Sequence, residues 1–63
     1  MTFKIGQIAY DNINKFYVIV EGRKVYRGEL RYYDVAHYSE NQESRYAAGV
    51  NQLRPLTKRE IGI

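Results

Sequence analysis

KFYVIVEGRKVYRGELRYYDVAHY, residues 15–38, is the stretch of sequence that decides the fold. It concentrates β-branched and aromatic residues and alternates apolar with polar positions, a pattern typical of β-strands. The apolar run Phe16 to Val20 is too short for a helix and suits a strand covered on both faces. Gly22 can adopt positive φ at no steric cost, so residues 21–23 are predicted to turn the chain. A strand over 24–27, a bend or bulge at 28–29 and a longer strand over 30–38, with Tyr33 and Val35 pointing inward, complete the stretch.

The flanking sequence predicts further strands and connections on both sides. Residues 5–10 alternate like a strand, and the polar segment 11–15 is rich in turn formers. SENQES (39–44) is predicted to be a loop, 45–50 a strand and 51–53 a short 3₁₀ turn. A helix over 39–48 is the alternative, although that segment lacks an i, i+3, i+4 apolar stripe. Residues 57–63 are predicted to form a frayed C-terminal tail.

Five short strands in a chain of this length predict an all-β fold, a small five-stranded barrel that occupies residues 1–56. An open sheet would leave long edges exposed for pairing with other chains. The 63 residues allow a single small domain with a limited core. The absence of cysteine excludes disulfides and thiolate metal sites. No apolar run reaches membrane-spanning length and the N-terminus lacks a signal-peptide pattern, so we expect a soluble, cytoplasmic protein without membrane contact.

Positive charge and tyrosine are the two unusual features of the composition. Ten Lys and Arg against seven Asp and Glu give a formal net charge of +3, and seven tyrosines exceed what so small a core can hide. Cations that meet phosphates, next to rings that stack on bases, are typical of nucleic-acid-binding surfaces. The candidate residues are Arg23, Lys24, Tyr26, Arg27, Arg31 and Tyr32. The alternative is a solvated hairpin whose charges protect an edge strand.

No catalytic or metal-binding motif stands out in the sequence. His37 is the single histidine, without acidic residues at ligand spacing, and is predicted to be packed or hydrogen-bonded in a structural role. The glycines do not form a phosphate-binding loop, and the acidic residues do not pair for acid–base work. We therefore predict a protein that is not an enzyme and has no metal or cofactor.

Three segments carry a resemblance to a known family. YDVAHY (33–38), with Asn41 and Glu43, and VNQLRPL (50–56) resemble the second half of a Tudor-type domain, and KFYVIV (15–20) is similar to its aromatic second strand. The resemblance, shared with KOW-type domains, implies a Src-homology-3-like barrel. It also implies an aromatic cage that would bind a methylammonium group by cation–π attraction, formed by Tyr10, Tyr17, Tyr38 and Asn41. Alternatively, Tyr10 and Tyr17 are partners in cross-strand packing.

The sequence as a whole predicts a non-catalytic binding module. The leading partner is DNA or RNA, or a nucleic-acid-bound complex, contacted through the basic and tyrosine-rich hairpin. The alternative is a protein-interaction module, such as a small accessory or inhibitory protein of a phage or mobile element, because tyrosine and arginine are favoured interface residues. An exposed strand edge or exposed rings covered by a second copy would make a homo-oligomer.

Overall fold

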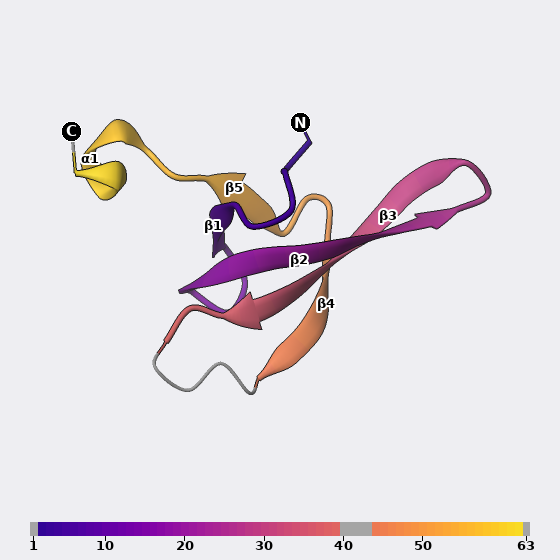
Figure 1. Ribbon diagram of the computed structural model, residues 1–63, viewed down its shortest axis with the longest axis horizontal. Coiled ribbons are helices and arrows are strands. Elements are labelled where there is room, and N and C mark those ends of the chain that lie inside the picture. Colours follow the sequence, from indigo (N-terminus) through magenta and orange to yellow (C-terminus); the bar gives the residue numbers. More distant parts are fainter. Residues whose placement is uncertain (1, 40–43, 63) are drawn as a thin grey trace.

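The computed structural model describes residues 2–39 and 44–62. These residues form β1 (Ile8–Asp11), β2 (Phe16–Tyr26), β3 (Glu29–His37), β4 (Arg45–Gly49), β5 (Leu53–Pro55) and the short helix α1 (Lys58–Ile61). The strands make one antiparallel sheet in the order β4-β3-β2-β1-β5, strongly twisted so that β2 and β3 cross in Figure 1. The prediction of an all-β fold is confirmed, and the number of strands agrees, although the predicted strands over 16–20 and 24–27 both lie in β2 and β5 was not predicted.

The sheet is not closed into a barrel. β5 returns beside β1, where Ala9 pairs with Pro55, and β4 lies at the opposite end of the strand order. Within the described residues no pairing joins β4 to β5. The sheet is therefore curled and open, with β4 and β5 as its edge strands.

The core lies inside the curl of the sheet. Its buried members come from all five strands and from the N-terminal segment: Phe3, Ala9, Val18, Val20, Tyr33, Val35, Ala48 and Leu53. The predicted inward positions of Tyr33 and Val35 are confirmed, since both are fully buried. Phe3 belongs to a segment without apolar periodicity, and its burial was not foreseen. Its ring meets Tyr33 edge-on at a centroid distance of 5.3 Å, and its N–H donates to the Tyr33 hydroxyl over 3.0 Å.

The turn predicted over 21–23 is wrong, because β2 runs through it. Val20 pairs with Val35 and Gly22 with Asp34, which leaves Glu21 as an extra residue in β2. Such an insertion is a β-bulge, which bends a strand and increases its twist without reversing the chain. The chain reverses instead at Arg27 and Gly28, so the strand predicted over 24–27 is the far half of β2.

The C-terminal part also differs from the prediction. The N–H of Gln52 donates to the carbonyl of Gly49 over 2.9 Å, an i→i+3 bond that lies earlier than the predicted 3₁₀ turn, and Leu53 begins β5. Residues 45–48 lie in β4, which contradicts the helical alternative there, whereas 40–43 lie outside the described residues. The tail is not frayed through the described residues, because α1 forms with Thr57 as its N-cap.

Candidate functional site

A two-stranded arm extends from the sheet and contains the six predicted nucleic-acid residues. We call residues 22–32 the β2–β3 arm; its tip projects beyond the rest of the molecule, at the opposite end of the long axis from α1 (Figure 1). The molecule is accordingly elongated, with extents of 37 × 25 × 20 Å. Neither β1 nor β4 covers the tip, because β1 pairs only with residues 16–19 of β2 and β4 only with residues 32–36 of β3.

The turn at the tip holds an arginine in a conformation that favours glycine. Arg27 has φ 52° and Gly28 φ 79°, so both central residues of this two-residue hairpin are left-handed. Positive φ at both positions defines a type I′ turn, whose twist matches that of the flanking strands and whose preferred residues are Asn-Gly. A left-handed residue with a Cβ costs about 1–2 kcal/mol. The turn therefore presents Arg27 at the end of the arm at a cost in local strain.

A second bulge re-aims the side chains of the arm. Lys24 pairs with Tyr32 and Val25 with Leu30, so Arg31 is the extra residue of β3. The side chains of a strand alternate between its faces, so Lys24 and Tyr26 share one face, on which Tyr32 lies opposite Lys24. These side chains, with Val25 and Arg31, line an open hollow of about 560 Å³.

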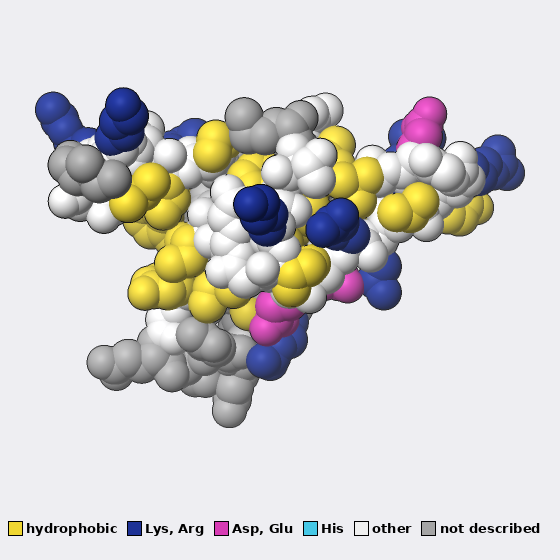
Figure 2. All heavy atoms as spheres, turned by 45° about the horizontal axis from the view of Figure 1, so that its top comes forward, with side chains coloured by type: hydrophobic (Ala, Val, Ile, Leu, Met, Phe, Trp, Pro, Cys, Tyr) yellow, Lys and Arg dark blue, Asp and Glu magenta, His cyan; other side chains and the backbone are white. Residues whose placement is uncertain are grey.

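Large apolar and aromatic side chains of the arm lie in solvent. Val25 and Tyr26 are each 63% exposed and Tyr32 is 52% exposed. Figure 2 shows yellow apolar and dark-blue cationic side chains next to one another on the arm, at the right of the view. The arm thus combines cations with exposed rings, as the sequence predicted.

The whole excess of positive charge lies on this arm. Residues 22–32 contain four cations against a single acid, Glu29, and this surplus equals the formal net charge of the chain, +3. Lys24 lies 3.6 Å from the carboxylate of Asp34, and Arg31 lies 3.0 Å from that of Glu29. All four side chains are well exposed, and such ion pairs contribute only about 0–1 kcal/mol. A phosphate can therefore replace either carboxylate at little cost.

The other two cations of the arm are not paired with any carboxylate of the described residues. The Arg27 guanidinium lies 5.7 Å from the ring centroid of Tyr26, and none of the ion pairs among the described residues includes Arg23. The arm therefore brings together all six predicted residues and leaves its cations accessible to an anionic partner.

The predicted aromatic cage lies on a different part of the molecule. Tyr10 and Tyr17 are cross-strand partners with ring centroids 5.1 Å apart, which is the packing alternative raised by the sequence. The Arg54 guanidinium lies 4.4 Å from the Tyr10 ring centroid, so a cation of the same chain already covers that ring. Tyr38 is exposed and lines a small hollow of about 290 Å³ with Tyr17, whereas Asn41 lies outside the described residues. Methylammonium binding by these residues stays a prediction.

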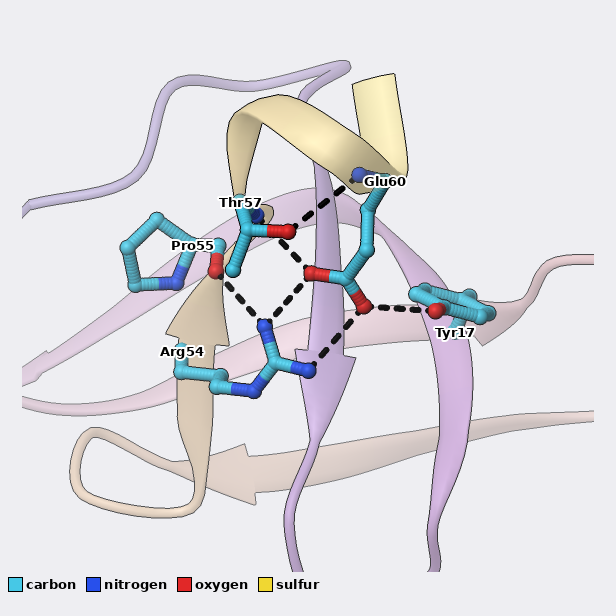
Figure 3. A network of polar contacts seen from close by, with 5 residues as sticks. All are labelled: Tyr17, Arg54, Pro55, Thr57 and Glu60. Carbon is cyan, nitrogen blue, oxygen red and sulfur yellow. Dashed lines mark hydrogen bonds and ion pairs between the residues drawn. The ribbon is translucent and has the colours of Figure 1, made fainter. Parts of the chain in front are cut away.

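A network of polar contacts ties the C-terminal segment to this region (Figure 3). The Glu60 carboxylate accepts hydrogen bonds from both terminal nitrogens of Arg54, at 2.7 and 3.0 Å, and from the hydroxyl of Tyr17, at 2.6 Å. It also accepts the N–H of Thr57 over 2.8 Å, and the Thr57 hydroxyl in turn accepts the N–H of Glu60, which completes a capping box. The bonds from Arg54, Thr57 and Tyr17 hold the pKa of Glu60 well below its usual value. α1 is therefore anchored to β2 and β5.

A second polar network surrounds Asp11, which is fully buried at the end of β1. One carboxylate oxygen accepts the N–H groups of Ile13 and Asn14, each over 2.8 Å. The other accepts side-chain donors from Asn14 at 3.0 Å, from Gln52 at 2.8 Å and from the hydroxyl of Tyr46. Burial alone would raise the pKa of Asp11, but the hydrogen bonds from Tyr46, Asn14 and Gln52 lower it to about 2. Burial and the bond to Asp11 raise the pKa of Tyr46.

Asp11 joins segments far apart in the sequence, although the sequence pattern places it only in a polar turn. The Asx pattern of DNIN gives the local contacts, but the partners 35 and 41 residues away leave no signal in a single sequence. Every group around the carboxylate is a donor from the chain itself, so this network serves the fold.

The single histidine packs against an aromatic ring. The rings of His37 and Phe16 are 4.2 Å apart and inclined at 60°. No group of three or more metal-ligating side chains occurs within residues 2–39 and 44–62. In the same part of the chain, no helix has the length and apolar character that crossing a membrane requires.

Comparison with known proteins gives no match: no family model, no curated protein and no solved structure is similar to the chain.

Proposed function

We propose that the protein is a non-catalytic binding module that contacts nucleic acid, or a nucleic-acid-bound complex, through the β2–β3 arm. One observation carries the proposal. The entire surplus of positive charge of the chain lies on a projecting ribbon whose rings are exposed, while the remaining charges balance. The phosphates of a nucleic-acid backbone form a dense row of negative charge, and aromatic rings beside cations suit the bases next to them.

Salt-dependent binding to labelled DNA and RNA tests this proposal. If Arg23, Lys24, Arg27 and Arg31 all contact phosphates, the affinity falls with salt at a log–log slope of about −3 to −4. Replacing Arg23 and Arg27 together by glutamine removes two of these contacts, so the slope becomes shallower by about 1.4 to 1.8. Absence of binding at low salt would refute the proposal.

A matched control separates the arm from net charge. Replacing Lys58 and Arg59 by glutamine removes the same two charges from α1, at the opposite end of the molecule. Under the proposal this variant keeps the slope of the wild type. If the salt slope becomes equally shallow in the two double variants, the nucleic acid is attracted to the whole surface without specificity. The arm would then have no special role.

A protein partner is the second candidate function. The 63% exposure of Val25 favours it, because a bare valine beside tyrosine and arginine is typical of a protein interface rather than a phosphate-binding surface. The edge of β4 also offers backbone groups to an added strand. If a captured protein partner stays bound after nuclease treatment and at moderate salt, a protein-interaction function is favoured. If partners are lost on nuclease treatment, the nucleic-acid function is favoured.

The Src-homology-3-like barrel of Tudor and KOW domains is likewise a proposal for the fold. Four strands in meander order, a bulged β2 and a final strand that returns beside β1 support it. The open edge between β4 and β5 separates the chain from a fully closed barrel.

A further inference from the structure

The hollow on the arm is open and is lined by two tyrosines, a valine and two cations. Lys24 and Tyr26 share a strand face, and Tyr32 lies opposite Lys24 on the neighbouring strand. One phenol ring therefore lies next to Lys24 along β2 and the other lies across from it on β3, and Val25 and Arg31 complete the lining of a hollow of about 560 Å³. Its walls are largely apolar ring and aliphatic surface, and its charged groups are cationic.

The two rings of the hollow lack the aromatic partners that other rings have. Ring-to-ring contacts in the described part of the chain lie around the body of the sheet, and none includes Tyr26 or Tyr32. Exposed rings without aromatic partners can stack on a planar group. The Arg27 guanidinium lies 5.7 Å from the Tyr26 ring centroid, so a group that stacks on Tyr26 takes the other face of the ring or displaces Arg27. Lys24 and Arg31 border the same hollow, and their exposed pairings with Asp34 and Glu29 are weak enough to be exchanged for phosphate.

We propose that the arm binds single-stranded nucleic acid, with an unpaired base stacked in the hollow between Tyr26 and Tyr32 and the flanking phosphates on Lys24 and Arg31. This inference rests on the proposed nucleic-acid function. Bases within a duplex are already stacked on one another and do not present their faces to a protein. Rings that flank a hollow are therefore of use against a single strand, whereas a duplex would use only the cations.

Competition between two probes tests the preference. Fluorescence anisotropy is measured with a labelled oligothymidylate and with a labelled duplex of mixed sequence and equal length, at the same salt concentration. The inference expects the oligothymidylate to bind more tightly. It also expects Tyr26→Leu and Tyr32→Leu each to weaken binding of the single strand by about 5- to 150-fold, the range found for loss of one stacked base. The salt slope stays as in the wild type, because the cations remain.

Three controls distinguish stacking from other effects. Tyr26→Phe and Tyr32→Phe keep the rings and are expected to retain wild-type affinity. Tyr38→Leu removes an exposed tyrosine from outside the arm and is also expected to leave affinity unchanged. Circular dichroism melting checks that the leucine variants remain folded, as their exposure leads us to expect.

The outcomes separate the inference from the proposed function. If the duplex binds as tightly as the oligothymidylate and the leucine variants bind normally, the stacking inference is wrong. The nucleic-acid function would still stand in that case, provided that Arg23→Gln/Arg27→Gln makes the salt slope shallower. If neither probe binds at low salt, both are refuted.

Discussion

Replacing Asp11 by asparagine is expected to destabilise the fold strongly at neutral pH. The carboxylate is fully buried, and five donors of the chain point at its two oxygens. An asparagine has one oxygen and one NH₂ group. In either orientation of the amide, its NH₂ group therefore faces hydrogen-bond donors of the chain. Hydrogen bonds to a charged group contribute about 1.5–3 kcal/mol each, and an unpaired buried donor costs a further 1–3 kcal/mol.

The expected loss is about 2–4 kcal/mol, which is large for this chain. Domains have roughly 0.05–0.15 kcal/mol of stability per residue, or about 3–9 kcal/mol for the 63 residues here. Urea unfolding at pH 7, followed by circular dichroism, measures the difference. A free energy of unfolding within about 0.5 kcal/mol of the wild type would refute the role assigned to Asp11.

Because the pKa of the Asp11 carboxyl is lowered in the folded protein, the fold is expected to lose stability in acid. Its pKa lies near 2 in the folded protein against an ordinary value of 3.8. A lowered folded-state pKa stabilises the fold fully above the unfolded value, and this contribution is lost as pH falls through 3.8 towards 2. The difference corresponds to about 2 kcal/mol. Glu60, whose pKa is also lowered, contributes to acid unfolding in both proteins, so the difference between wild type and Asp11→Asn isolates Asp11.

Tyr46→Phe provides a milder test of the network. It removes one donor to the charged Asp11 carboxylate and keeps the ring, so we expect a loss of about 1.5–3 kcal/mol. With one hydrogen bond fewer, the pKa of Asp11 in the folded protein rises. The loss of stability in acid then begins at a higher pH. Tyr38→Phe, in an exposed position, is the matched control and should leave both the stability and its pH dependence unchanged.

Two further substitutions test the arm, each by urea unfolding. Arg27→Asn places the preferred residue in the type I′ turn and is expected to raise the free energy of unfolding by about 0.5–1 kcal/mol, while it weakens nucleic-acid binding; a less stable variant would contradict the strain at Arg27. Gly22→Ala is expected to cost about 1 kcal/mol, because the added Cβ would lie 3.1 Å from the Asp34 carboxylate that holds Lys24. Gly49→Ala, whose Cβ meets nothing within 4 Å, is the control and should be neutral or slightly stabilising.

The strand content of this chain can be predicted from its sequence, because burial of one face of a strand gives its apolar residues a period of two. Tyr33 and Val35 follow that period and are buried as expected. Gly22 was misread because the same residue type serves turns and bulges, and only the register with Asp34 distinguishes them. The true turn carries an arginine where glycine or asparagine is usual, so its local signal was weak.

The residues of the arm were identified from the sequence, but their arrangement was not. Proximity along the chain was enough to group the four cations and two tyrosines, because they lie on one hairpin. Which of them share a face depends on the bulge at Arg31, which reverses the alternation of β3, and a pattern of single residues does not reveal an insertion. Phe3 and Asp11 were missed for a related reason, since their partners come from strands far along the chain.

Three departures from ordinary folding rules coincide on the β2–β3 arm. Arg27 adopts a left-handed conformation, Val25 and Tyr26 are left bare, and like charges gather where the sheet offers few neighbours. Each costs stability or solubility. Single features of this kind also occur outside the arm, since Lys15 has φ 62° and Ile5, Ile13 and Ile61 are exposed, so the arm is distinguished by the combination of all three. Strain and exposed apolar surface persist where binding gains from them. An asparagine at position 27 would suit the turn better and carry no charge, so the proposed binding role supplies a reason for the arginine that the turn itself does not.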